Sequence, residues 1–386
     1  MNSNWTYKKL GEVARIVGGS TPLTTNPSNW TGKNAWITPA ELKERYISCT
    51  ERSISDEAAR RLELLPVGTV LLSSRAPIGK VALTTIPMYC NQGFKNIICG
   101  ESLYNEYTYW CILANVPRLQ GLGVGATFKE ISKRIVENFE IPVPALSKQH
   151  SIAEELDTIQ SILDKQNTQL LELDKLAQAI FCEMFGDLLS NEKGWNISTL
   201  GTLFDIGSSK RVYQSEWTTS GVPFYRAREI VKLAKDGHVD NELFIAETLY
   251  DQYAAKYGVP NEGDILVTAV GTLGVTYIVK HNDRFYYKDG NIICLHQNGS
   301  QVNSLYVDFC FKTPFIRQQI DNWNGATVGT FTIVKAKATR IPLPPLSLQQ
   351  SFAEKIEAIE QQKQLLRQSI RETEKLLAAR MQYYFD

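Results

Sequence analysis

The sequence predicts an α+β protein built as a tandem duplication, in which each half is a mixed α/β domain followed by a long helix. In segment 149–185 apolar residues recur at alternating steps of four and three, which places them along one side of a helix. The same stretch returns about two hundred residues later. Short runs bounded by Gly and Pro, which are typical of strands and turns, precede each copy. We expect the two long helices to pair as an antiparallel coiled coil.

The length of 386 residues is enough for two or three domains with cores of their own. The repeat sets the boundaries that we expect. A first domain covers 1–145, a long helix 146–190, a second domain 191–345 and a second long helix 346–386.

Composition excludes several classes of protein. The chain is 43% apolar and 21% charged, as in ordinary soluble proteins. No apolar run approaches the ~20 residues of a membrane span, and the first residues lack the basic and apolar regions of a signal peptide. We therefore expect a cytoplasmic protein without membrane contact. The seven cysteines include no C-x-x-C pair, which favours reduced core thiols and no metal site.

The charge is unevenly distributed although its sum is zero. Residues 1–145 hold 16 basic and 12 acidic side chains, whereas 146–190 hold 3 and 8. A first domain with a slight basic excess can touch DNA phosphates, but it lacks the excess that tight, salt-sensitive binding requires.

The first domain reads as short strands and turns that lead into a helix. A strand at 12–17 precedes the turn Gly18-Gly-Ser-Thr-Pro22, whose glycines let backbone approach a ligand closely. The further elements that we expect are a short helix at 39–45, strands at 70–73, 81–85, 89–94 and 96–99, a helix at 104–114, the glycine-rich segment 121–127 and the proline-stiffened exit 141–144.

The long helix of roughly 36 residues would measure about 54 Å at 1.5 Å per residue, and it needs a partner to bury its apolar stripe. Its own copy is the obvious partner, although the core of a helical bundle is the simpler reading of any heptad run. Only Gln166 interrupts the first stripe, whereas Lys363, Thr373 and Arg380 make the copy a poorer seam. The residues expected to pair the helices are Ile152, Leu156, Ile159, Leu163, Leu170, Ile356, Ile359, Leu366 and Ile370.

The second half repeats the frame of the first but not its loops. Segment 263–268 matches 68–73, Asn291-Ile-Ile-Cys294 repeats Asn96-Ile-Ile-Cys99, and Gly325-Ala-Thr327 repeats Gly125-Ala-Thr127. The turn that begins at Gly18 instead becomes Gly207-Ser-Ser-Lys-Arg211. A kept frame with divergent polar loops suits two copies that read different targets. Drift of unconstrained loops would give the same pattern.

Few motifs support catalysis. Gly121-x-Gly-x-Gly125 lacks the strand and acidic residue of a dinucleotide site. The chain contains no Asn-Pro-Pro-Tyr or Asp-Pro-Pro-Tyr loop of an amino-methyltransferase. Glu41-Leu-Lys43 resembles the end of a nuclease motif, but its equivalent at Glu229 lacks the lysine. The four histidines have no serine or cysteine elbow beside them.

The sequence also contains a group of residues whose side chains can recognise DNA. Arg and Lys pair with guanine edges, Gln pairs with adenine, and all of them can hold phosphates, while Trp and Tyr can stack or brace loops. Any single member of such a set is as readily a surface charge or a core aromatic. The candidate DNA-binding residues are Gly19, Ser20, Thr21, Trp36, Thr38, Ser74, Arg75, Lys80, Gln92 and Lys95 in the first domain, and Ser209, Lys210, Arg211, Tyr225, Arg226, Arg228, Thr268 and Lys288 in the second.

Several motifs together resemble those of a known family, the specificity (S) subunits of type I restriction-modification systems. The resemblance covers essentially the whole chain, twice. The motifs are Trp5-x(4)-Leu10-Gly11, the Gly-Gly-Ser-Thr-Pro loop, Trp36-Ile-Thr-Pro39, Ser73-Ser-Arg75 with Ile78-Gly-Lys80, Asn91-Gln-Gly-Phe-Lys95, Phe128-Lys-Glu-Ile-Ser132, and a Pro-x-Pro-x-Leu-x-x-Gln lead into each long helix. The second domain departs from the pattern where Tyr287-Lys-Asp-Gly290 replaces Gln92 to Lys95.

The resemblance implies a noncatalytic subunit with two target recognition domains, each binding one half of a split, asymmetric site in double-stranded DNA. It implies that the paired helices separate the domains and dock methyltransferase (M) subunits, two in number. Those subunits would supply the adenine N6-methyltransferase with S-adenosylmethionine. A restriction (R) subunit, whose presence stays open, would supply the ATP- and Mg-dependent translocase and nuclease. No cofactor is expected in this chain.

Helix length offers a physical reason for such a split site. A helix of about 54 Å exceeds one turn of DNA, which is about 34 to 36 Å, so two domains can face one side of the duplex with unread base pairs between them.

Two alternative functions stay open at this point. One is a protein-binding coiled-coil scaffold without DNA specificity, and the other is a duplicated self-contained enzyme that uses Glu41 or a histidine.

Overall fold

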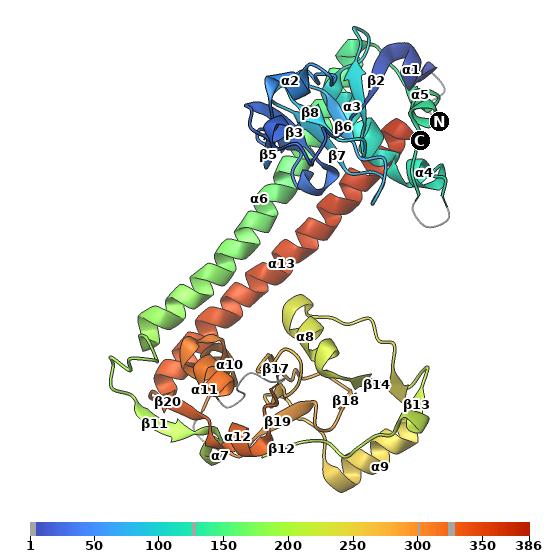
Figure 1. Cartoon of the computed structure of the whole chain (residues 1–386). Coiled ribbons are helices and arrows are strands. Elements are labelled where there is room, and N and C mark those ends of the chain that lie inside the picture. Colours follow the sequence, from blue (N-terminus) through green and yellow to red (C-terminus); the bar gives the residue numbers. More distant parts are fainter. Residues whose placement is uncertain (1–4, 126–128, 300–301, 323–328) are drawn as a thin grey trace. The chain divides into compact units, whose positions relative to one another are not determined.

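The chain divides into two compact units that share both long helices (Figure 1). The computed structural model describes residues 5–125, 129–299, 302–322 and 329–386. The first unit comprises Met1–Thr168 and Arg367–Asp386, and the second comprises Gln169–Leu366. Each unit therefore contains one mixed α/β domain and part of each long helix.

The long helices are α6 (Leu146–Phe185) and α13 (Leu346–Phe385), of 40 residues each. Both begin at the leucine that follows the proline-stiffened exit, since two prolines forbid helix up to that point. The predicted helix of roughly 36 residues is thus confirmed and is slightly longer than expected.

The first domain carries a five-stranded sheet in the order β2-β9-β6-β7-β4, a three-stranded sheet in the order β5-β3-β8, and the ribbon β1-β10. Its strands are β1 (Tyr7–Lys9), β2 (Ala14–Gly18), β3 (Asn34–Ile37), β4 (Tyr46–Ile47), β5 (Arg52–Ile54), β6 (Val70–Leu72), β7 (Val81–Thr84), β8 (Tyr89–Cys90), β9 (Lys95–Cys99) and β10 (Glu140–Pro142). Its helices are α1 (Leu10–Val13), α2 (Asp56–Ala59), α3 (Asn105–Ala114), α4 (Val116–Gly121) and α5 (Lys133–Glu137), with the 3-10 turns η1 (Pro27–Trp30) and η2 (Pro39–Glu41).

The second domain repeats the main sheet as β12-β19-β16-β17, beside a second sheet β13-β15-β14-β18 and the ribbon β11-β20. Its strands are β11 (Asn196–Thr199), β12 (Phe204–Gly207), β13 (Trp217–Thr218), β14 (Val222–Tyr225), β15 (Phe244–Ile245), β16 (Ile265–Thr268), β17 (Thr276–Ile278), β18 (Tyr286–Tyr287), β19 (Ile292–Gln297) and β20 (Arg340–Leu343). Its helices are α7 (Leu200–Leu203), α8 (Ala227–Asp236), α9 (Glu247–Tyr257), α10 (Ser304–Lys312), α11 (Pro314–Asn322) and α12 (Ile333–Ala338), with the 3-10 turn η3 (Gln214–Glu216).

Three elements differ from the sequence expectation. The strand expected at 12–17 begins as the short helix α1, because Leu10 and Val13 are both buried and the Leu10 N–H donates to the Phe139 carbonyl at 2.9 Å. The helix expected at 39–45 is only the turn η2. The strand expected at 89–94 stops at Cys90, where the chain turns into a loop. The repeated Gly-Ala-Thr motifs and Phe128 lie wholly or partly outside the described residues.

The sheet register corrects one internal match. Val70 pairs with Ile97, while its counterpart Ile265 pairs with Leu295. Strand pairing therefore aligns Asn96 with Cys294. The local identity Asn-Ile-Ile-Cys instead aligns Asn96 with Asn291, three residues earlier. Backbone pairing across the sheet fixes the alignment, and a four-residue identity does not.

The long helices pack antiparallel where each unit holds them together. In the first unit Gln166 Nε2 donates to Ser369 Oγ at 2.8 Å, and Arg380 bonds Glu155. Residue numbers rise along one helix as they fall along the other, which confirms the predicted pairing. Of the nine predicted pairing residues, seven are buried, and Leu170 and Leu366 are partly exposed.

The charged residues between the two long helices have ion-pair or hydrogen-bond partners, so they do not simply weaken the helix pairing. Lys363 is 7% exposed, and its ammonium lies 2.7 Å from Asp174 and 2.6 Å from Glu360. Arg380 binds Glu155 and Tyr384. The expectation of a poorer seam therefore missed the acidic partners on the facing helix.

All seven cysteines are free, and Cys90, Cys111, Cys294 and Cys310 are buried, as core thiols should be. Among the described residues, no helix is both long and apolar enough to cross a membrane.

Candidate nucleic-acid interface

The predicted loops of the first domain meet on one surface. The loop after β2 lies against the loop after β8, because the Ser20 N–H donates to the Cys90 carbonyl at 2.9 Å and Thr21 Oγ1 donates to Gln92 Oε1 at 2.6 Å. At Gly19 a Cβ would lie 2.1 Å from the Asn91 carbonyl oxygen, so the close approach of the two loops requires glycine.

A second set of contacts extends this surface. Lys80 Nζ donates to the Pro39 carbonyl at 3.0 Å, and the Ser74 N–H donates to the Gly93 carbonyl at 2.8 Å. Lys95 Nζ donates to Ser74 Oγ at 3.2 Å. We call this the first loop surface and define it as residues 19–21, 38–41, 74–80 and 91–95.

Trp36 supports the loop after β2, and Glu41 holds the turn that begins at Thr38. Trp36 is 2% exposed, and its indole N–H donates to the Ser20 carbonyl at 3.1 Å. The Thr38 N–H donates to Glu41 Oε1 at 2.8 Å, and the Glu51 N–H donates to Glu41 Oε2 at 2.8 Å. Both Glu41 oxygens therefore serve the backbone, which gives this carboxylate a capping role.

The second domain brings its predicted loops together in the same manner. Ser209 Oγ donates to the Tyr287 carbonyl at 2.6 Å, and the Lys210 N–H donates to the Tyr286 hydroxyl at 3.0 Å. The Lys288 N–H donates to the Tyr225 carbonyl at 2.8 Å. We call residues 208–211, 225–229, 269–272 and 288–291 the second loop surface.

Most cations of the second loop surface hold acidic partners. Arg211 Nε lies 2.9 Å from Asp289 Oδ2. Arg226 and Arg228 both bind Glu229, and Arg228 also binds Glu242. Burial raises the pKa of Glu229, but the hydrogen bonds from the two arginines lower it by more, so the pKa lies below its usual value. Glu229 also accepts the Arg226 N–H, as Glu41 does for Thr38.

Four predicted contact residues are too buried to touch a base as they stand. Trp36 is 2% exposed, Ser74 and Thr268 are 0%, and Tyr225 is 9%. Thr268 Oγ1 accepts the Val275 N–H and donates to the Thr272 carbonyl, which staples the loop after β16. In the structure these four side chains shape the loops, which for Trp36 and Tyr225 is one of the two roles expected. The other members of the predicted set lie at least partly exposed, and their contact with DNA stays a prediction.

Sequence reasoning missed two acids, Glu130 and Asp289. Glu130 lies 3.2 Å from Lys95 and 3.9 Å from Arg75. The positions of these acids follow from loops that are far apart in sequence. Each acid does lie within a motif named from the sequence, Glu130 in 128–132 and Asp289 in 287–290.

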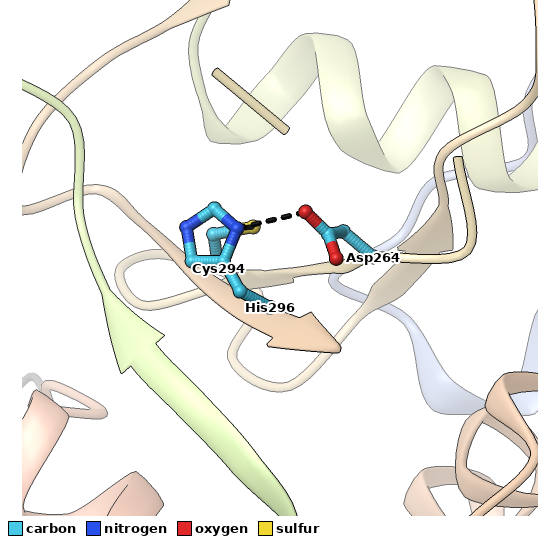
Figure 2. Close-up of side chains that lie close together, drawn as sticks. All are labelled: Asp264, Cys294 and His296. Carbon is cyan, nitrogen blue, oxygen red and sulfur yellow. Dashed lines mark hydrogen bonds and ion pairs between the residues drawn. The ribbon is translucent and has the colours of Figure 1, made fainter. Parts of the chain in front are cut away.

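A cluster of metal-ligand types lies outside the two loop surfaces. In Figure 2, His296 faces Asp264 with Cys294 beside them, and one ligand atom of each lies within 4.8 Å of the others. Both Asp264 oxygens already accept hydrogen bonds, Oδ1 from the Gln297 N–H and Oδ2 from the Asn261 N–H and His296 Nδ1. Burial raises the pKa of the Cys294 thiol well above its usual value, so the protonated form predominates. The arrangement is that of a hydrogen-bonded clamp.

The remaining histidines stand apart from one another. His150 stacks against Tyr104 at 3.8 Å between ring centroids, His281 bonds Glu262, and His238 lies near the Asp236 carbonyl. All three side chains are exposed.

Comparison with known proteins agrees with the duplicated architecture. A type I restriction enzyme specificity subunit from Methanocaldococcus jannaschii, MjaIX, is 28% identical over 373 residues, which cover 90% of this chain and 85% of the relative. The EcoKI specificity subunit of Escherichia coli K12 is 22% identical over 74% of this chain and 65% of its own length.

Solved structures share the fold at lower identity. A chain from a structural study of complex assembly and conformational transition of a type I R-M system matches with a TM-score of 0.63 at 18% identity, covering 99% of this chain and 97% of that chain. The S subunit of a type I restriction-modification system from M. genitalium matches with a TM-score of 0.58 at 16% identity, covering 100% and 97%.

The family model described as the type I restriction modification DNA specificity domain matches residues 2–173 and again residues 192–375. The two matches cover both halves of the duplication. The chain therefore belongs to the family of type I restriction-modification specificity subunits, which are themselves noncatalytic.

Proposed function

We propose that each domain of this DNA specificity subunit reads one half of a split, asymmetric site in double-stranded DNA through its loop surface. The observation that carries the proposal is that loops distant in sequence converge at matching places in both domains, yet present different side chains. Thr21 and Gln92 meet in the first domain, whereas Arg211 and Asp289 meet in the second. A kept frame with different polar groups suits the reading of two different sequences.

The cations of the loop surfaces set how tightly DNA is held. Among the described residues, no carboxylate lies within ion-pair distance of Lys80 or Lys288, whereas Arg75, Lys95, Arg211, Arg226 and Arg228 each have one. Phosphate contact by the paired cations requires partial exchange of these partners. Binding by this subunit alone should therefore be weak, and specificity should come from groups aimed at base edges.

The paired helices would set the number of unread base pairs between the two half-sites. A 40-residue helix measures about 60 Å, which exceeds one turn of DNA. The Gln166–Ser369 hydrogen bond and the Asp174–Lys363 ion pair fix the register of the helices. The exposed faces of α6 and α13 are the surfaces on which two M subunits would dock.

Catalysis would then reside on the partners. M subunits would bind S-adenosylmethionine and methylate adenine N6, and an R subunit, where the system has one, would use ATP and Mg. Within the described residues, Glu41 is fully engaged by backbone N–H groups, which argues against its use as a catalytic carboxylate.

The test is to co-express the chain with the methyltransferase of its system and to map N6-methyladenine across a host genome at single-base resolution. We expect a split motif that disappears when this chain is omitted. A complex that forms and yields no chain-dependent motif would contradict DNA specificity and favour a scaffold. Methylation by the chain without a partner would contradict its noncatalytic role.

A further inference from the structure

An acidic side chain lies between two cations of the first loop surface. Glu130 Oε1 accepts from Lys95 Nζ at 3.2 Å, and Glu130 Oε2 lies 3.9 Å from an Arg75 guanidinium nitrogen. The second distance is an ion pair that is longer than a hydrogen bond. Lys95 is thus held by Glu130 and Ser74, whereas Arg75 is attracted to the carboxylate, and no described residue accepts a hydrogen bond from its guanidinium.

The backbone fixes Glu130 independently of its side chain. Its N–H and C=O both pair with Val124 at 3.0 Å, and the next N–H, of Ile131, donates to the Ser74 carbonyl at 3.0 Å. Arg75 and Glu130 face each other as an isolated β-bridge. The carboxylate is therefore presented to Arg75 from a position that backbone hydrogen bonds set, and a change of its charge leaves these bonds in place.

The arrangement is particular to the first domain. The equivalent bond in the second domain runs from the Phe331 N–H to the Ala269 carbonyl, so Thr330 and Val270 stand where Glu130 and Arg75 do. By ladder position Ile293 replaces Lys95. A general structural need of the fold would have kept the acid in both halves.

An acid on a DNA-binding surface repels phosphate, so its presence there calls for a different role. A carboxylate beside an arginine lowers the attraction of that arginine for phosphate, which depends on charge. It weakens less the bidentate contact with guanine O6 and N7, which depends on donor geometry. Ordering of a long side chain before binding also reduces the entropy that binding must lose.

Resting on the proposed function, we propose that Glu130 is a positioning residue that holds the Arg75 guanidinium for bidentate recognition of a guanine in the half-site read by the first domain. Lys95 completes the arrangement, because it neutralises one carboxylate oxygen and keeps the side chain of Glu130 in place. Exposed fractions of 39% for Arg75 and 42% for Glu130 leave both reachable from solvent.

The experiment maps N6-methyladenine made by the complete methyltransferase complex that contains wild-type chain, Glu130→Gln, Glu130→Asp, Arg75→Ala or a control. We expect Arg75→Ala to relax one guanine position of one half-site. Glu130→Gln should relax the same position, with methylation of mismatched sites rising roughly tenfold relative to matched ones, the scale of one lost bidentate pair. Glu130→Asp should restore part of the discrimination. The other half-site should stay unchanged.

Two controls separate positioning from charge and from folding. Glu137→Gln removes an acid from α5 that pairs with Lys133 at 3.6 Å, and it should leave the motif unchanged. Asp289→Asn removes the acid beside Arg211, and any change that it causes should fall in the other half-site. A merely repulsive Glu130 would behave differently, since Glu130→Gln would then tighten binding to all sequences equally and keep the motif.

The outcomes distinguish this inference from the proposed function. The inference is overturned if Arg75→Ala relaxes the motif and Glu130→Gln does not, or if Glu130→Gln relaxes a cytosine position that Arg75→Ala leaves intact, which would make the carboxylate a direct reader of cytosine N4. It is equally overturned if neither variant alters a motif that the wild-type complex does produce. Failure of the proposed function would appear instead as the absence of a chain-dependent motif with wild-type chain.

Discussion

Asp264 ties the turn before β16 to the end of β19 with one buried side chain. It accepts the Asn261 N–H from the turn before β16, the Gln297 N–H from the end of β19, and a hydrogen bond from His296. Burial raises the pKa of Asp264, but His296 and the two backbone N–H groups lower it by more, and the pKa lies below its usual value. The first domain has Thr69 at this position, and its hydroxyl donates to the Pro66 carbonyl three residues away.

We expect Asp264→Asn to destabilise the second domain by about 1–3 kcal/mol, because the new amide NH2 must face a backbone N–H that loses its acceptor. Hydrogen exchange of amides in segment 261–297 should report this loss locally, while the first domain keeps its protection. Asp240→Asn, a change of an exposed aspartate, is the matched control. Equal protection in Asp264→Asn and wild-type chain would contradict the clamp.

The effect of Asp264→Asn on the free energy of unfolding should depend on pH. A carboxyl group whose pKa is lower in the folded state stabilises the fold fully above its unfolded pKa of about 3.9. This contribution is lost as pH falls through the folded pKa. The stability difference between wild-type chain and Asp264→Asn should therefore shrink below about pH 4. Denaturation profiles measured at a series of pH values would check this, and a difference that grows on acidification would contradict it.

At the scale of elements, the start of each long helix is joined to its own domain by a duplicated glutamine. Gln149 and Gln349 are both 0% exposed. The Gln149 amide oxygen accepts the Tyr104 N–H at 2.8 Å, and that of Gln349 accepts the Asn303 N–H at 2.8 Å. Each amide NH2 donates to the second proline carbonyl of the preceding exit, at 2.8 Å in both halves.

Replacement of either glutamine by leucine should therefore loosen the attachment of one helix to one domain. Each orphaned buried backbone group costs about 1–3 kcal/mol. For Gln349→Leu we expect faster hydrogen exchange at the start of α10 and α13, with α3 unaffected, and the reverse pattern for Gln149→Leu. Gln169→Leu, at an exposed position of α6, is the control and should change neither region. A uniform loss of protection in both domains would argue against two independent clamps.

Sequence predicted the elements better than their cross-links. The heptad spacing and the internal repeat are periodic signals, so they predicted both long helices and their antiparallel pairing. The pair Arg75–Glu130 joins residues 55 positions apart, and no local pattern encodes such a distance. Asp174 and Glu155, which pair with Lys363 and Arg380, lie on the facing helix, which is why these positions looked like weak points of the seam. Burial of Trp36 likewise depends on the loop that folds over it.

At the scale of the whole molecule, the duplication gives the chain two similar domains, each followed by one of the long helices α6 and α13. Each unit holds part of both helices. The strand order of the main sheet and the glutamine clamps are kept in both domains, while the loop surfaces carry different side chains. Domain specificity and helix length should therefore vary independently. Exchange of residues 191–345 for those of a relative should change one half-site and leave the other half-site and the spacer unchanged, as read from the methylation motif.

Helix length is the complementary variable. Four residues can be inserted after Gln166 and four more before Ser369, so that the residues on either side of this pair stay opposite one another. The two insertions lengthen the helix pair by about 6 Å, or nearly two base-pair steps of 3.4 Å. We expect a methylation motif whose two halves are unchanged and whose spacer grows by about one or two base pairs. A four-residue insertion after the exposed Gly258 lengthens a loop and no helix, so it should leave the spacer as it is. If the lengthened helices still support methylation with the original spacer, helix length does not set the spacing. The spacing would then have to follow from how each domain is held against DNA by the partner subunits.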